Sequence, residues 1–539
     1  MSATRRTVGF GALAAAALSA APRAALAYGG DSYSVSGKKG PYVKQVAGRT
    51  FGPGGGAGGS LGLASDTGNL GRYQAARLRM PQTEARIAAL LAKIDTQWPY
   101  AKGQPLQVHI LGVDYYNAYS LADGSIVVAF GLLDQAQSDD EVAFVLAHEL
   151  GHVRLGHFNR QPVAATRQSA VNSAAQFLVV SSALQAGGLS SSAVAAATQA
   201  GATTDLLKFM TTVMVEPEHT RAQEDEADCI GYDLSQAAAF SADSASAKVF
   251  DTIQADQQKR TAVVDTLNTQ LKSQLSHAIT SGQALSMLNG GDLRSGLLQG
   301  AGRLAIGVAA SRASEAPPQH RPPEERKRGM AEYSAAAYPE GAPLRNEQKT
   351  WLTAVRATNE FAQAKLAVTA VSDTKRARAD GHYDIARAAI QRARQTTLRN
   401  APLVLNEAAR LSDDMGDTAS AERLYQQANA SPDQTVDGYV DHVRMLFRTK
   451  QYDRALTVAS EGVARFGNDD KPFISLRIAI NHAEGRTDQV EADLAHCESY
   501  GNPDLTKDCQ LAAGKNPKAA SDRKQPSSVP NLPFGLPHF

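Results

Sequence analysis

The sequence predicts a mainly helical α+β chain, in which a domain with a small β-sheet is followed by a series of helical repeats. Three observations carry this prediction. Short runs with strand character precede a capped helix, apolar residues recur with helical spacing through much of the remainder, and a pattern of small residues returns every 34 or 35 residues near the C-terminus. The 539 residues suffice for two to four domains, and a hydrophobic fraction of 43% suffices for ordinary globular cores.

The first 27 residues have the pattern of an export signal. The pair Arg5 and Arg6 precedes an uncharged, Ala- and Leu-rich stretch, and an A-x-A cleavage site ends at Ala27. We expect cleavage near Ala27 and a periplasmic location. The paired arginines suggest twin-arginine export, whereas the stretch that follows fits the general secretory route at least as well.

Net charge and cysteine content limit which partners and which cellular compartment the sequence favours. A formal net charge of +1, with no basic patch interleaved with aromatics, gives no argument for nucleic acid as a partner. Cys497 and Cys509 either form one disulfide in an oxidising compartment or remain independent thiols, and the sequence leaves both alternatives open. Cys229 is expected to be a small packing residue.

The first folded elements are predicted after a flexible segment. Residues 28–71 are rich in Gly and Ser, so we expect them to be flexible and the first domain to begin at about residue 72. A helix is predicted from Pro81 to Trp98 by the spacing of its apolar residues. Three short strands, Gln107–Leu111, Asn117–Leu121 and Ile126–Phe130, then predict a small sheet.

A capped helix after this sheet carries the motif HExxH. Ser138 and Glu141 have the spacing of a capping box. His148 and His152 are four residues apart, so both imidazoles lie on one helix face and can bind the same ion. Glu149 lies about 100° further round the helix, where it can hold a water molecule bound to that ion. The alternative is a core helix whose histidines only hydrogen-bond to their neighbours.

A third metal ligand is expected downstream, because hydrolytic zinc sites use three protein ligands and one open position. Glu224 and Asp228 are four residues apart on a predicted helix and share a face. One carboxylate can bind zinc, and the other can orient a ligand histidine through its second ring nitrogen. We therefore predict Glu224 as the ligand and Asp228 as the orienting group, with Glu226 as a weaker candidate. The alternative is an acidic, solvated helix face.

These residues and their neighbours give the chain a resemblance to a known family. From about Val108 to Arg326 it resembles the zinc metallopeptidases that include the CAAX prenyl endopeptidase and the bacterial heat-shock membrane protease. The matching motifs are Asn117-Ala118-Tyr119 for the family's Asn-Ala-Phe strand, Gly131-Leu132-Leu133 for its Gly-Leu-Leu, His148 to His152 followed by His157 for its zinc helix, and Arg221-x-x-Glu224-x-x-Ala227-Asp228 for its third-ligand segment.

The resemblance implies a zincin-like metallopeptidase domain over residues 72–315 that holds one Zn²⁺ per chain. It implies that His148, His152 and Glu224 bind the zinc and that Glu149 is the catalytic base. Behind these ligands it places Asp228 and His157, and it implies that Asn117, Ala118 and Tyr119 form an edge strand that accepts the substrate backbone. Recognition through the backbone does not predict narrow side-chain specificity.

One segment departs from the family pattern. The family has a Ser/Thr-His-Pro segment near the active site, whereas this chain has Arg321 between His320 and Pro322. In the family this histidine can approach the metal as a transition-state helper or as a plug. We extend that role to His320 as a hypothesis, the alternative being a solvated loop histidine.

The remaining stretches of the chain carry fewer signals. Residues 168–204 contain no charged residue and predict either a pair of packed helices over the active site or a surface that dips into the membrane. Residues 234–310 are predicted to be a helical insertion with no assigned function, and 316–344 a Pro- and charge-rich linker. The Pro- and Ser-rich tail 515–539 is predicted to be disordered.

A repeat occupies the C-terminal region. The pattern Gly381-His-Tyr383-x-x-Ala386 returns at Gly416, Tyr452 and Gly485 with a period of 34 or 35 residues. This resembles the second half of a tetratricopeptide repeat and predicts an α-solenoid over residues 345–514. The alternative is an unrelated helical bundle. Stacked repeats form a concave surface that binds peptides or proteins.

Export signal, protease domain and repeats together resemble the periplasmic β-barrel-assembly-enhancing proteases. The first functional hypothesis is therefore a periplasmic zinc endopeptidase that cleaves misfolded or stalled envelope proteins, with repeats that bind protein partners such as outer-membrane assembly machinery. The rival is a repeat-containing chaperone or scaffold with a latent or structural zinc site. An intact Glu149 favours the enzyme, because a purely structural site needs no base.

Overall fold

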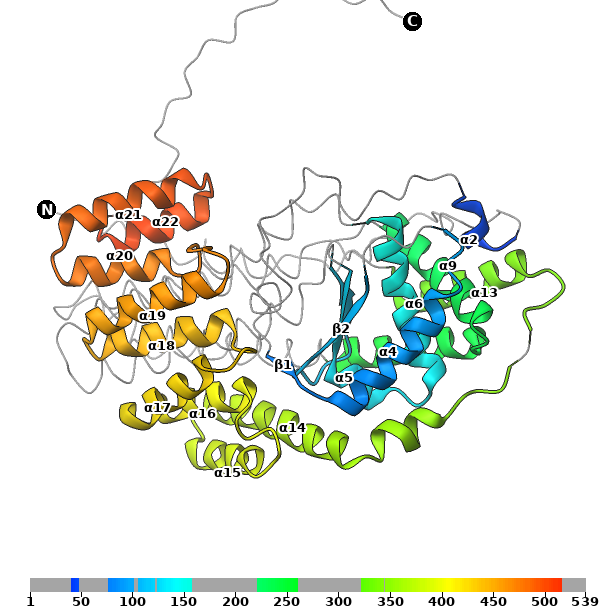
Figure 1. Cartoon of the computed structure of the whole chain (residues 1–539), viewed down its shortest axis with the longest axis horizontal. Coiled ribbons are helices and arrows are strands. Elements are labelled where there is room, and N and C mark those ends of the chain that lie inside the picture. Colours follow the sequence, from blue (N-terminus) through cyan, green and yellow to red (C-terminus); the bar gives the residue numbers. More distant parts are fainter. Residues whose placement is uncertain are drawn as a thin grey trace, which may run out of the picture.

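The computed structural model describes residues 40–47, 76–100, 105–121, 124–157, 221–259, 321–343 and 345–515. The predicted export signal, the uncharged stretch 168–204, His320 and the tail after residue 515 lie outside these residues. The described chain has two parts (Figure 1): a domain with a small sheet and the helices around it, and a curved series of helices that leads away from it. We call the first part the sheet domain and the second the helical stack.

The sheet has four strands in the order β1-β2-β4-β3. β2 (Gln107–Leu111) pairs in parallel with β4 (Ser125–Ala129), which is buried along its whole length. β1 (Arg77–Leu78) and β3 (Ala118–Ser120) are antiparallel edge strands. The three longer strands occur where they were predicted, whereas two-residue β1 is too short for an alternating pattern to reveal it.

Helices pack on this sheet and on one another. α4 (Pro81–Asp95) starts with proline at its first position, where no backbone N–H is needed, and buries the apolar face that predicted it. α5 (Phe130–Gln135) follows β4 directly. α6 (Asp139–Leu155) begins at Ser138, whose hydroxyl accepts the Glu141 N–H at 3.2 Å, and ends at Gly156 with φ of 66°. The Glu141 carboxylate accepts the backbone N–H of Gln137, one residue before the N-cap, so the second bond of the predicted capping box is shifted by one residue.

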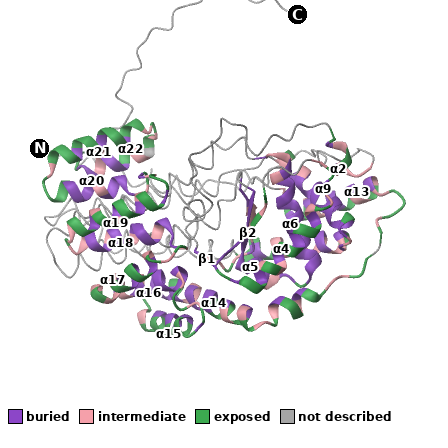
Figure 2. Cartoon of the chain, viewed as in Figure 1, coloured by how far each residue is buried: buried purple, intermediate pink, exposed green. Residues whose placement is uncertain are grey.

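Two glycines allow α6 to cross α9 (Arg221–Ala237) at short range. A Cβ added to Gly231 would lie 3.1 Å from the backbone nitrogen of His148, and one added to Gly151 would lie 3.3 Å from the Cα of Ala227. Larger residues at these positions would push the helices apart. The crossing therefore brings the acidic residues of α9 next to the histidines of α6. Figure 2 shows that both helices are buried over most of their length.

Two segments differ from the sequence prediction. Residues 40–47 were expected to be part of a flexible segment, but Tyr42–Gln45 form the short helix α2, and the Tyr42 side chain is 1% exposed. Residues 316–344 were expected to be a linker, but Pro323–Ala337 form helix α13, which packs against α9. Both segments have a Gly-, Pro- or charge-rich composition that predicts irregular structure. A few buried side chains nevertheless hold each of them as a helix against the sheet domain. Residues 242–259 are helical, as predicted for the start of the insertion.

The helical stack begins after a π-helical turn, Leu352–Arg356. Each helix pair packs closely, and buried residues line the facing sides of the helices (Figure 2). The predicted period appears in the backbone, because Gly381, Gly416, Lys450 and Gly485 all have positive φ in the turn between paired helices. The helices of the stack are α14 (Asn359–Ala379), α15 (Tyr383–Arg394), α16 (Pro402–Asp414), α17 (Thr418–Asn429), α18 (Val436–Arg448), α19 (Tyr452–Arg465), α20 (Ile474–Ala483), α21 (Thr487–Ser499) and α22 (Pro503–Ala512).

The stack and the turn that precedes it contact the sheet domain directly. The indole N–H of buried Trp351 donates to the Leu133 carbonyl at 3.1 Å, and the rings of Phe130 and Phe361 lie 4.9 Å apart. At the far end of the stack, a disulfide joins Cys497 to Cys509, whereas Cys229 is a buried free thiol in the sheet domain. Among the described helices, each is too short or too polar to cross a bilayer.

Candidate metal centre

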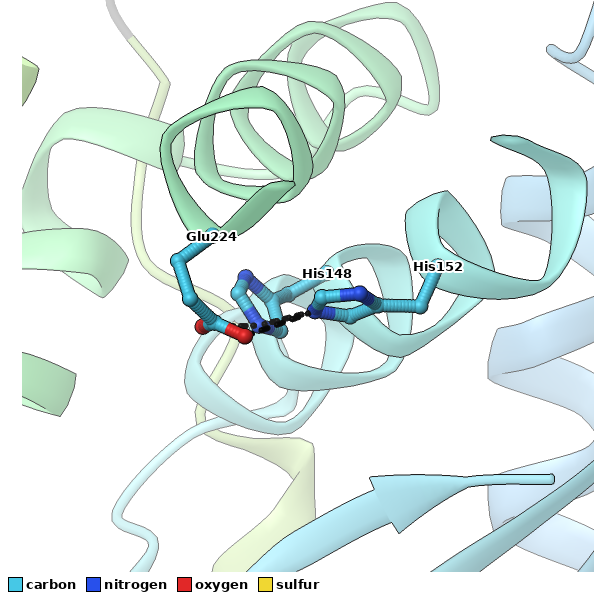
Figure 3. A group of neighbouring side chains, drawn as sticks. All are labelled: His148, His152 and Glu224. Atoms are coloured by element: carbon cyan, nitrogen blue, oxygen red, sulfur yellow. Dashed lines mark hydrogen bonds and ion pairs between the residues drawn. The ribbon is translucent and has the colours of Figure 1, made fainter. Parts of the chain in front are cut away.

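Three side chains from two crossing helices converge on one point. His148 and His152 project from α6, and Glu224 projects from α9 toward both imidazoles (Figure 3). The Nε2 atoms of the histidines are 3.1 Å apart. The Glu224 carboxylate oxygens lie 3.5 Å from Nε2 of His148 and 3.4 Å from Nε2 of His152. The helix spacing that predicted these residues therefore places all three donors together.

The donor set fits a zinc ion. Two ligand atoms at about 2.0–2.1 Å from a tetrahedral ion are about 3.3 Å apart, which is close to all three observed separations. All three residues are buried, and they form a group of His and carboxylate donors that could hold a metal. Two imidazoles and one carboxylate are a donor set typical of hydrolytic zinc sites.

A carboxylate and an arginine support His148 from behind. Oδ1 of Asp228 lies 2.9 Å from Nδ1 of His148, as predicted from the spacing of Asp228 and Glu224 on α9. Arg326, on α13, donates to both Asp228 oxygens at 2.6 and 2.9 Å. Burial alone would raise the pKa of Asp228, but the charge of Arg326 and the hydrogen bond from His148 hold it well below its usual range. Asp228 is therefore ionised and can fix the ring of His148.

The protein groups also make this site attractive to a cation. Burial alone would lower the pKa of His148, but hydrogen bonds to Asp228 and Glu224 outweigh it and raise the pKa to about 9. Positive charge is therefore favoured at this imidazole. A metal ion can supply the same charge once it displaces the proton.

His152 has a different support. Its Nδ1 atom lies 2.9 Å from Nδ1 of His157, which follows the end of α6. Nε2 of His157 lies 3.2 Å from the Glu226 carboxylate on α9. The structure thus places His157 behind a candidate ligand rather than among the ligands. Glu226, the weaker ligand candidate from the sequence, contacts His157 instead.

A pocket opens beside the three donors. It is lined by the predicted substrate strand, Asn117, Ala118 and Tyr119, and by Glu149, which is 6% exposed. The edge position of β3 leaves the strand a side that faces away from its partner β4. Arg321 also lines the pocket and forms two hydrogen bonds to buried Asp225, whereas its neighbour His320 lies outside the described residues. The apolar part of the lining comes from Leu132, Phe144, Val145, Val249, Phe250 and Ile253.

Several of these residues were not predicted from the sequence. Arg326 ended the matching region but had no assigned role. Val249, Phe250 and Ile253 lie in the insertion to which no function was assigned. Arg326 is 98 residues from Asp228 along the chain, so no local spacing could connect the two.

The sequence around this site is similar to that of known metalloproteases. Residues 81–292 match the model of peptidase family M48. Over 132 residues the chain is 33% identical to the metalloprotease LoiP of Escherichia coli K12, which covers 24% of this chain and 45% of that protein. Over 55 residues it is 42% identical to the metalloprotease YcaL of the same organism, which covers 10% of this chain and 21% of that protein. The chain thus spans less than half the length of these curated relatives.

Proposed function

We propose that this chain, in which residues 81–292 match the model of peptidase family M48, is a zinc-dependent endopeptidase. The observation that carries the proposal is the set of three donor atoms of His148, His152 and Glu224, 3.1 to 3.5 Å apart, at a pocket that also contains Glu149. A zinc ion bound there supplies Lewis acidity to a scissile carbonyl and lowers the pKa of an attacking water.

The surrounding residues provide the remaining parts of a hydrolase. Glu149 follows His148 directly in α6 and lines the pocket, where it takes a proton from the attacking water and passes it to the leaving nitrogen. β3 offers an extended edge to which a substrate backbone can add as a further strand. The substrates are therefore extended or unfolded polypeptides. His320 is retained as a proposed transition-state helper or plug.

We further propose that the protein acts in the periplasm on misfolded or stalled envelope proteins. The export signal ending near Ala27 supports this location, and the period of 34 or 35 residues in the stack supports a tetratricopeptide solenoid. Such a solenoid binds protein partners, for which outer-membrane assembly machinery is our candidate. The uncharged stretch 168–204 is a candidate for peripheral membrane contact.

Metal removal tests the proposed activity. The purified protein should cleave an unfolded protein such as casein, lose this activity with a chelator, and regain it with one equivalent of zinc. Glu224→Gln should lower zinc occupancy and activity together. As a matched control, exposed Glu332 lies on α13 outside the site, so Glu332→Gln should change neither. Casein cleavage that persists without metal would contradict the proposal.

The second candidate function is a chaperone with a latent zinc site, favoured by the stack that packs directly on the sheet domain. It predicts that the zinc-loaded protein suppresses aggregation of an unfolded client without cleaving it. His320→Ala should release cleavage if His320 is a plug. Cleavage by the unmodified protein would leave no need for this alternative.

A further inference from the structure

Helix α2 lies against α9, the helix that carries Glu224, although it is far from α9 in the sequence. The hydroxyl of Tyr42 donates to Oε1 of Glu226 at 2.5 Å, across 184 residues of chain. The other oxygen of Glu226 contacts Nε2 of His157 at 3.2 Å, and Nδ1 of His157 contacts Nδ1 of His152 at 2.9 Å. Tyr42, Glu226 and His157 thus form a continuous series of polar contacts that ends on a candidate zinc ligand.

The chemistry of the groups sets the direction of each hydrogen bond. A neutral imidazole has one N–H donor and one acceptor nitrogen. If Nε2 of His152 gives its lone pair to a metal, Nδ1 carries the proton and donates it to Nδ1 of His157. His157 then carries its own proton on Nε2 and donates it to Glu226. A carboxylate accepts from both sides, which completes the series with the Tyr42 hydroxyl.

Several other contacts hold Tyr42 in place, so its hydroxyl has a defined position. The backbone N–H of Tyr42 donates to the Tyr333 hydroxyl at 2.7 Å, and that of Val43 donates to the Asp233 carboxylate at 2.8 Å. The Tyr100 hydroxyl donates to the Val43 carbonyl at 2.8 Å. Residues 40–47 are therefore anchored to α9, to α13 and to Tyr100, which follows α4. This anchoring makes a side chain near the N-terminus as well positioned as one in the core.

We propose that Tyr42, Glu226 and His157 are positioning residues that hold His152 with Nε2 toward the metal, so that residues 40–47 form part of the metal site. This role rests on the proposed function, because that function identifies the metal as zinc. His148 is held by Asp228 and Arg326, whereas His152 is held by a series that depends on docking of the N-terminal segment. Metal affinity is therefore coupled to that docking. Removing an outer partner of a ligand histidine costs about 10- to 100-fold in metal affinity.

The test compares two hydroxyl deletions, one at Tyr42 on segment 40–47 and one at Tyr100, which contacts that segment. Tyr42→Phe removes the contact to Glu226 and keeps the buried ring, and Tyr100→Phe removes a contact to the same segment outside the series. Zinc affinity is measured by chelator competition, and the cobalt-substituted proteins are compared by their visible spectra. We expect Tyr42→Phe to weaken zinc binding about tenfold and to shift the cobalt bands, and Tyr100→Phe to match wild type. Glu226→Gln is the second variant and should also weaken binding.

The outcomes separate this proposal from the proposed function. Equal zinc affinities and cobalt spectra for wild type, Tyr42→Phe and Glu226→Gln would overturn the role of the series, even if wild type cleaves casein. A weaker affinity in Tyr42→Phe and Glu226→Gln alone would support it, even if no variant cleaves casein. Equal losses in Tyr42→Phe and Tyr100→Phe would show only that the segment must be docked, and would overturn the specific series. A wild type that binds neither zinc nor cobalt would overturn both proposals.

Discussion

Arg326, on α13, donates two hydrogen bonds to the carboxylate of Asp228, on α9, and Asp228 in turn contacts Nδ1 of His148. The arginine is thus linked to a candidate zinc ligand through one intervening carboxylate. It also stacks over the Phe250 ring at 4.8 Å, in a segment that lines the pocket. One residue therefore joins α13 and the insertion to the metal centre.

The first prediction concerns this arginine. Arg326→Gln leaves the buried Asp228 charge without its guanidinium partner, so we expect zinc affinity to fall about 10- to 100-fold. The free energy of unfolding should fall by about 3 kcal/mol, as expected when one partner of a buried ion pair is removed. Chelator competition and urea unfolding measure the two effects. The adjacent pair of Lys327 with Asp251 is exposed, so Lys327→Gln is the matched control and should match wild type. Unchanged zinc affinity in Arg326→Gln would contradict the prediction.

A second prediction concerns the contact between the stack and α4. Glu360, in the first turn of α14, accepts hydrogen bonds from the backbone N–H groups of Gln82 and Thr83 and from the Thr83 hydroxyl. It therefore caps a helix of the other part of the chain. We expect Glu360→Ala to lower the free energy of unfolding by about 1 kcal/mol, measured by urea unfolding. Exposed Glu332→Ala is the control, and equal stability of the two variants would refute the capping role.

A third prediction concerns pH. Burial lowers the pKa of His442 to about 4, whereas the unfolded value is 6.5. The unfolded state binds the proton more tightly, so stability from the neutral imidazole is fully present above pH 6.5. It is lost as the pH falls from 6.5 through about 4, by up to about 3 kcal/mol. The ring stacks on Tyr425 at 5.3 Å and contacts the Asn429 amide, so protonation acts inside the stack.

Unfolding of wild type and His442→Gln at several pH values measures this effect. Wild type should lose more stability than His442→Gln over this window. Exposed His382→Gln should keep the wild-type slope. Parallel pH curves for wild type and His442→Gln would rule out the assigned titration.

The features that could be predicted from the sequence are those that depend on the spacing of residues within one helix or one repeat. The capping pair Ser138 and Glu141, the i,i+4 histidines and the position of Glu224 relative to Asp228 all depend on one helix each. The geometry of a single helix is common to all proteins, so these residues could be placed without a structure. The repeat turns could be placed for the same reason, because Gly381 and its equivalents recur at a fixed interval.

What could not be predicted depends on contacts between remote segments. Tyr42 lies in a Gly- and Ser-rich stretch whose average composition predicts flexibility, yet its ring is buried and its hydroxyl reaches Glu226. Arg326 lies in a stretch whose Pro and charge content predicts a linker, yet its partner Asp228 makes it part of a packed helix. The average composition of a segment does not reveal that one of its side chains is buried and anchors it to the domain.

The most direct test of the central claim compares wild type with Glu149→Gln. Both proteins are analysed for bound zinc and for cleavage of casein under identical conditions. We expect about one zinc per chain in each, because Glu149 is not among the three donors, and cleavage by wild type only, with a loss of about 100-fold or more in the variant. Equal cleavage by both proteins, or no zinc in either, would contradict the account of this site as a zinc peptidase centre.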